Sequence, residues 1–142
     1  MTDNVKLLKE CDAGVKMGIN GIAQVKDKAS GENFVNLLDD YEKQHEKLYE
    51  IINRKLSECD EHKKDPNAWG EASAWASTNI KMMFNSEDEK IADLMIDGCN
   101  MGIKSVSKYM NKYNEASKEV MDIANDVVVL EQHFMNELRQ YL

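Results

Sequence analysis

The 142-residue chain is 42% hydrophobic and 31% charged, proportions that suit one compact domain, 1–142, with a single core. Its formal net charge of −8 disfavours nucleic-acid phosphates and anionic lipid, so no nucleic acid and no membrane is expected as a partner. No apolar run approaches the ~18 residues of a membrane span, and the start MTDNVKLLKE lacks a signal-peptide core, so we expect a cytoplasmic protein.

Apolar residues recur every three or four positions along most of the chain, which predicts an all-α fold. The first long helix is expected at about 3–26, with Thr2 or Asp3 as its N-cap. The second is expected at about 31–60, where apolar residues are spaced by three and four and Ser30 is the candidate cap.

The dipeptide Asp65-Pro66 then predicts a new helix start, because aspartate is a good N-cap and proline suits the first helical position. A short helix at 66–84 would follow, with apolar residues along one side. This segment is the expected crossover between the second and third long helices.

Two further long helices complete the pattern. The third is expected at about 87–112, with Ser86 and Glu89 as a capping box. The fourth is expected at about 117–141, with Ser117 as its cap. Both carry an apolar stripe that predicts burial of one face.

The lengths of the connections predict how these helices are joined. Short connections make the first and second helices, and the third and fourth, antiparallel hairpins. The crossover helix at 66–84 would extend about 28 Å, enough to return the chain to its starting end, so the second and third helices can lie parallel. This connectivity is that of a ferritin-like four-helix bundle of two hairpins joined by one long crossover.

An internal repeat indicates that the hairpins are copies of each other. The segments GVKMGINGI (14–22) and GCNMGIKSV (98–106) align without gaps. A stripe of small residues results, formed by Cys11, Gly14, Gly18 and Gly21 in the first helix and by Gly98, Gly102 and Ser105 in the third. The stripe predicts either tight packing between these two helices or a small cavity that could bind a ligand.

The stretch ASAWASTNIKMMFNSEDEKIADLMIDGCNMGIKSVSKYM, residues 72–110, resembles part of a bacterial ferritin-like four-helix-bundle family catalogued as a domain of unknown function. The shared features are a tryptophan-bearing crossover helix and a third helix that the family marks with Gly-Glu. The resemblance implies a ferritin-like bundle without an established common activity. This chain has Gly98-Cys99 at the Gly-Glu position, so a metal-ligand position of the family is lost.

The pair Glu42 and His45 has the Glu-x-x-His spacing of a di-iron bundle, in which each of two helices supplies such a pair and each of the others one Glu. The positions expected for the single Glu residues hold Val15 and Cys99. Neither register we compared for the fourth helix, with His133 or with Phe134 opposite His45, gives a second Glu-x-x-His. A working di-iron centre is therefore not expected.

Two interpretations of the remaining polar residues stay open. In one, Glu42, His45, Glu131 and His133 approach one another and hold a single zinc or iron ion. In the other, no cofactor is bound: His45 is a core residue hydrogen-bonded to Glu131 or to a tyrosine, Glu42 lies at the edge of the stripe, and His133 lies near solvent.

The sequence thus favours a non-catalytic module that acts structurally, through a protein partner or through self-association. A metal-binding or ferroxidase-like protein with an atypical site around Glu42 and His45 is the alternative. The three cysteines are odd in number and far apart, which favours reduced thiols over disulfides or a zinc knuckle. No phosphate loop or nucleophile motif is present in the sequence.

Overall fold

The computed structural model describes residues 1–59 and 87–142, and both stretches are helical without any strand, as predicted. The predicted crossover helix at 66–84, its Asp65-Pro66 start and the Ser86 cap lie outside the described residues. The predicted bounds of the four long helices agree closely with the observed ones. The elements are α1 (Asp3–Lys26), α2 (Glu32–Glu58), α4 (Asp88–Lys112), α5 (Lys118–Leu138) and the short 3-10 helix η1 (Arg139–Tyr141).

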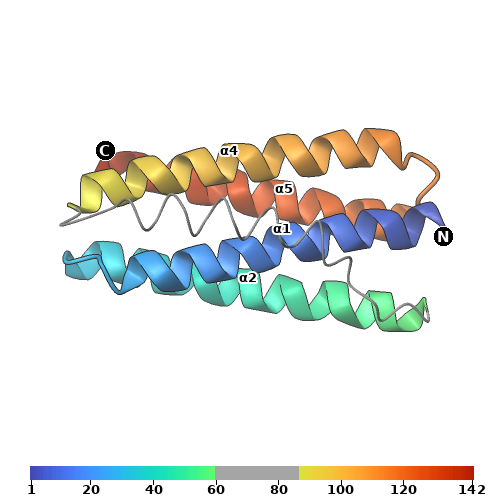
Figure 1. The fold of residues 1–142 in the computed structure, drawn as a ribbon, viewed down its shortest axis with the longest axis horizontal. Coiled ribbons are helices and arrows are strands. Elements are labelled where there is room, and N and C mark those ends of the chain that lie inside the picture. Colours follow the sequence, from blue (N-terminus) through green and yellow to red (C-terminus); the bar gives the residue numbers. More distant parts are fainter. Residues whose placement is uncertain (60–86) are drawn as a thin grey trace.

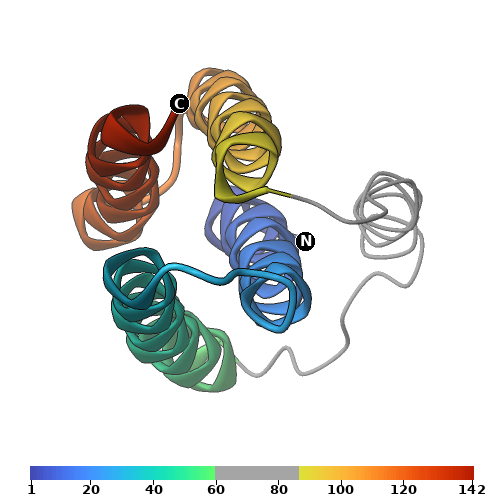
Figure 2. The same ribbon diagram turned by 90° about the vertical axis from the view of Figure 1, so that its left-hand side faces the viewer.

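The four long helices lie side by side, roughly along the long dimension of the molecule (Figure 1). Seen end on, they surround a shared interior, with α1 between α2 and α4, and α5 between α4 and α2 (Figure 2). The most extensive contacts join α1 to α2 and α4 to α5. The chain therefore forms two helix pairs that pack against each other as a four-helix bundle.

Buried apolar side chains from all four long helices form one hydrophobic core. The apolar stripe expected on α2 is buried throughout, and it contains one polar residue, His45, that is fully buried. A helix presents the same face every three or four residues, so this spacing places one side of α2 in the core. No helix within 1–59 or 87–142 is long and apolar enough to cross a membrane.

The local signals at the helix starts are confirmed at two of the expected caps. The hydroxyl of Thr2 accepts a hydrogen bond from the Val5 amide (3.4 Å), and the hydroxyl of Ser117 accepts one from the Val120 amide (3.3 Å). The prediction for Ser30 is wrong, because the N-cap residue of α2 is Gly31 and no side chain caps it within its own hairpin.

A carboxylate from the other hairpin binds the loop directly before α2. Asp88, at the start of α4, accepts hydrogen bonds from the backbone amides of Ser30 (2.9 Å) and Gly31 (2.8 Å). A Cβ atom at position 31 would lie 2.7 Å from the Asp88 carboxylate, which explains the glycine. An ionised acceptor gives a stronger hydrogen bond to the amides than a serine hydroxyl would.

A matching link joins the other end of the bundle. Asn4, in the first turn of α1, accepts a hydrogen bond from the Ser117 amide (2.7 Å), and Asp3 accepts one from the Glu115 amide (3.1 Å). Asn4 and Asp88 are 84 residues apart (4 to 88), the same separation as in the glycine repeat. Each hairpin loop is therefore held by the first turn of the other hairpin.

Candidate functional site

His45 of α2 and Glu131 of α5 form a hydrogen-bonded pair in the core. The ring Nε2 of His45 lies 2.5 Å from Oε1 of Glu131, and Nδ1 lies 2.6 Å from the carbonyl oxygen of Tyr41. A carbonyl oxygen can only accept, so Nδ1 carries a proton and donates it. Both ring nitrogens are thus engaged, as the interpretation of His45 as a core residue predicted.

The charge state of the pair follows from its surroundings. Burial lowers the pKa of His45, but the charge of Glu131, its hydrogen bond and the Tyr41 carbonyl outweigh burial and raise the pKa above its ordinary value. The side chain of Glu131 is only 12% exposed. An imidazolium beside a carboxylate is neutral overall, which is the arrangement in which a buried charge is tolerated.

Aromatic contacts support the pair along the α2–α5 interface. Tyr41 stacks on Phe134 with ring centroids 4.5 Å apart, and the His45 ring meets Phe134 edge-on at 6.0 Å. The Tyr41 hydroxyl donates a hydrogen bond to Glu137 of α5. These contacts fix the orientation of His45 between its two acceptors.

The buried cysteines do not provide a thiolate. The thiol of Cys99 on α4 hydrogen-bonds to Glu131, and burial, followed by the charge and hydrogen bond of that carboxylate, raises the pKa of Cys99. Burial, with the charges of Glu10 and Asp12, raises the pKa of Cys11 to about 12. Nucleophilic or metal-binding cysteine requires the thiolate, so both side chains behave as small core residues at neutral pH.

Each member of the pair lies against a glycine of its own hairpin. A Cβ atom at Gly18 would lie 2.8 Å from Cδ2 of His45, and one at Gly102 would lie 3.5 Å from Cγ of Glu131. Gly18 and Gly102 are equivalent in the repeat, but the contact is tight only at Gly18, since 3.5 Å is an ordinary van der Waals distance. The tight packing predicted between the first and third helices is therefore not what Gly18 provides: it lies against a polar side chain of α2.

His45 and Glu131 occupy equivalent positions in the two hairpins. They are 86 residues apart (45 to 131), and so are the starts of α2 and α5, Glu32 and Lys118. Neither register that we compared in the sequence, with His133 or with Phe134 opposite His45, has this separation. The predicted helix starts, 31 and 117, are also 86 residues apart, and this separation would have paired His45 with Glu131.

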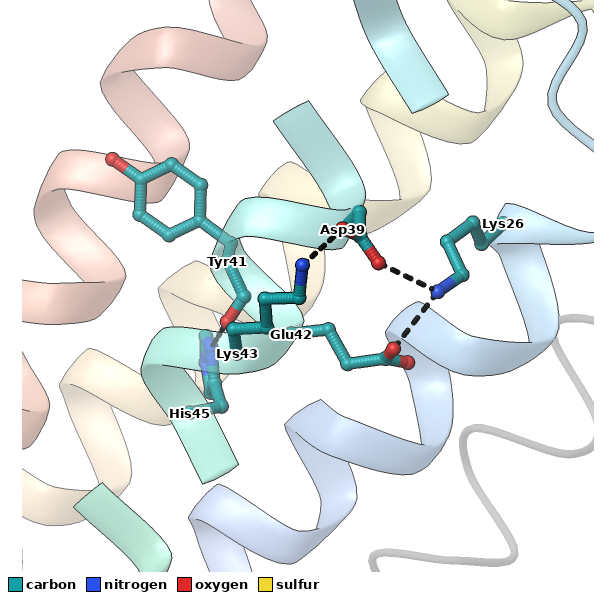
Figure 3. Close-up of polar contacts among 6 residues, drawn as sticks. All are labelled: Lys26, Asp39, Tyr41, Glu42, Lys43 and His45. Atoms are coloured by element: carbon teal, nitrogen blue, oxygen red, sulfur yellow. Dashed lines mark hydrogen bonds and ion pairs between the residues drawn. The ribbon is translucent and has the colours of Figure 1, made fainter. Parts of the chain in front are cut away.

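Glu42 points away from the pair. Its carboxylate lies 2.9 Å from Nζ of Lys26, at the end of α1, and Lys26 also contacts Asp39 at 3.1 Å. Figure 3 shows Glu42 extended toward Lys26, whereas His45 lies beside the Tyr41 carbonyl. The side chain of Glu42 is partly exposed, so its position at the edge of the stripe is confirmed.

His133 is exposed and lines a surface hollow of about 320 Å³ between α2 and α5. It follows Glu131 by two residues, which places it about 200° around the helix from the buried carboxylate. The four predicted metal ligands are therefore not assembled around one point: only His45 and Glu131 meet. Within the described part of the chain, no group of three or more His, Cys, Asp or Glu side chains is arranged to hold a metal ion.

The glycine stripe also borders a cavity of about 50 Å³ between α1 and α4, next to the pair. At Gly14 and Gly21 an added Cβ would meet no atom of the described residues within 4 Å. The cavity that the stripe allowed is thus present at these two positions. The described residues that line it are Gly14, Met17, Gly18, Gly21, Ile22, His45, Leu94, Met95, Gly98, Cys99, Gly102, Val106, Val127, Glu131 and Phe134.

Alanine substitutions should have opposite effects on stability at the glycine that contacts His45 and at the glycines that border the cavity. Gly18→Ala should lower the free energy of unfolding by about 1–3 kcal/mol, because its Cβ overlaps the His45 ring. Gly14→Ala and Gly21→Ala should raise that free energy by up to about 1 kcal/mol, because alanine favours the helix and has room. Urea unfolding of the three variants checks this, and equal effects at positions 14 and 18 would contradict it.

The pH dependence of stability should reveal the ion pair. Because the folded pKa of His45 is raised, the pair stabilises the fold fully below about pH 6.5, and this contribution is lost as the pH rises through the raised pKa. In Glu131→Gln only burial acts strongly on the ring and lowers its pKa. That variant should therefore lose stability relative to the native chain on acidification from about pH 7.5 to about pH 5.5.

Chemical unfolding at both pH values, with an NMR titration of the His45 ring, measures the effect. His133→Gln, which alters the exposed histidine, is the control and should follow the native chain. A Glu131→Gln variant that follows the native chain at both pH values would show that the carboxylate does not raise the pKa of His45.

Comparison with family models, with curated proteins and with solved structures found no match to this chain. The ferritin-like resemblance of residues 72–110 thus stays a prediction from the sequence.

Proposed function

We propose that the chain is a ferritin-like four-helix bundle without a working di-iron centre, which acts as a non-catalytic structural or protein-interaction module. The observation that carries the proposal is the His45–Glu131 pair. The imidazole is bonded at both nitrogens, and its Nε2 faces a carboxylate where a metal ligand would face a metal ion. The pair uses its hydrogen bonds to connect α2 with α5.

The arrangement of the helices supports the ferritin-like part of the proposal. In Figure 1, α2 returns along α1 and α5 returns along α4, while α2 and α4 start at the same end of the bundle. Two antiparallel hairpins with α2 parallel to α4 require one long crossover, which is the ferritin-like connectivity. The repeated glycine contacts and the repeated loop links fit a two-fold arrangement of the hairpins.

The distribution of charge supports the absence of a di-iron centre. Two metal ions need several carboxylates to compensate their charge. The positions on α1 and α4 at which single Glu residues were expected hold Val15 and Cys99, both buried. Glu42 is neutralised by Lys26 at the edge of the bundle, which leaves Glu131 as the carboxylate beside His45.

Iron loading tests this part of the proposal. Tag-free protein loaded anaerobically with ferrous iron and then desalted should retain no stoichiometric metal and should not accelerate iron oxidation by oxygen. One or two retained ions per chain with oxidase turnover would overturn the proposal and favour the alternative, a ferroxidase-like protein. Loss of these ions in a Glu131→Gln variant, but not in Glu42→Gln, would then assign them to the buried pair.

For the interaction, the surface hollow between α2 and α5 favours a second copy of the chain. Its apolar lining includes Leu48 and Ile51, and Ile51 is 37% exposed. Lys47 of α2 and Asp126 of α5 also line it and carry opposite charges. A two-fold axis through the hollow would place Lys47 of each copy opposite Asp126 of the other, because an isologous contact exchanges equivalent residues.

Charge reversal tests this contact. In sedimentation velocity at increasing concentration, the native chain should form a dimer, and Ile51→Glu and Lys47→Glu should each remove it. The double variant Lys47→Glu/Asp126→Lys should restore it, because the opposite charges are exchanged. Met101→Glu alters an exposed methionine of α4 outside the hollow and should have no effect. A native chain that stays monomeric, or a dimer unaffected by Ile51→Glu, would contradict self-association at this surface.

A further inference from the structure

The cavity between α1 and α4 has the features of a small binding site. Most of its lining is apolar, and Met17 and Met95 supply flexible side chains from the two helices that flank it. Protein interiors are normally filled to the density of organic crystals, so a space beside two glycines that could each accommodate a Cβ atom is unusual.

Solvent can reach the region of the cavity. Gly14 and Gly18 of α1 and Gly98 and Gly102 of α4 are each partly exposed, although they lie against the core. Glycine has no side chain, so at these four positions the backbones of α1 and α4 border the cavity directly. A volume of about 50 Å³ is too small for a ring such as benzene, which favours a small unbranched molecule.

The polar lining restricts the charge of a ligand. Glu131, His45 and Cys99 all border the cavity. Because Glu131 is balanced by the imidazolium of His45, a charged ligand would find no uncompensated opposite charge among the described residues that line the cavity. A carboxylate offers about four lone-pair sites, and His45 and Cys99 use two, so Glu131 can still accept a hydrogen bond from a hydroxyl group.

The volume restricts the size of the ligand. One water molecule needs about 10–15 Å³ of such a cavity, so a space of about 50 Å³ corresponds to about three or four non-hydrogen atoms, the size of a three-carbon alcohol. We propose that the cavity between α1 and α4 binds a short, unbranched, uncharged aliphatic molecule whose hydroxyl group donates a hydrogen bond to Glu131. This site rests on the proposed function in one respect, because it requires a His45–Glu131 pair that holds no metal ion, and it is independent of the α2–α5 surface.

The test uses 1-propanol as the probe and the intact chain labelled with ¹³C at the methionine methyl groups. The resonances of Met17 and Met95 should shift and saturate, while Met101, which is exposed and does not line the cavity, should show only a small linear solvent effect. Propionate and propylammonium, which have the same length but carry a charge, should give no saturable shift.

Variants that fill the cavity provide the matched control. Gly14→Leu places a side chain in the space from a position whose Cβ would not contact His45, and it should abolish the saturable shift while helix content and cooperative unfolding are retained. If that variant does not fold, Gly21→Leu is used in its place. Glu131→Leu should weaken 1-propanol binding at least tenfold.

Three results would overturn the proposal. The first is a linear shift with 1-propanol that is similar at Met17, Met95 and Met101, which would indicate a solvent effect. The second is binding that persists when the cavity is filled. The third is tighter binding of propylammonium than of 1-propanol, which would show that Glu131 attracts cations despite His45.

Discussion

The hydrogen bond between His45 and Glu131 is the constraint on which the interior depends. A buried histidine and a buried carboxylate are each unfavourable alone, and together they form a neutral pair whose partners come from α2 and α5. The His45 ring must also have room, which is why α1 presents glycine at position 18. One polar contact thus joins α2 to α5 and requires the small residue on α1 beside it.

The glycine stripe has two different roles along its length. Near the pair, Gly18 lies so close to the His45 ring that a side chain would collide with it. One turn earlier and nearly one turn later, at Gly14 and Gly21, no described atom would contact a side chain, and the stripe borders a cavity. A repeat that favours close packing at one position thus leaves empty space at its neighbours, because the polar side chains fill only the middle of the interface.

The sequence predicted the features that depend on local chemistry. The spans of the long helices and the Thr2 and Ser117 caps follow from spacing and from nearby side chains, and they are confirmed. The hydrogen bonds from the Ser30 and Gly31 amides to the distant Asp88 could not be predicted, because that carboxylate reaches the loop only in the folded bundle. The possible bond of His45 to Glu131 was foreseen, but the salt bridge between Glu42 and Lys26 was not, since the predicted hairpin does not specify which side chains of its two helices meet.

The links at the two ends of the bundle have a consequence for how the molecule holds together. Asp88 of the second hairpin binds the loop of the first, and Asn4 of the first hairpin binds the loop of the second. The loop amides of Gly31 and Ser117 thus donate to acceptors that belong to the other hairpin. Each hairpin therefore supplies the side chain that orders the loop of the other. Opening at one end removes contacts of both hairpins at once, which favours unfolding of the bundle as a single cooperative unit.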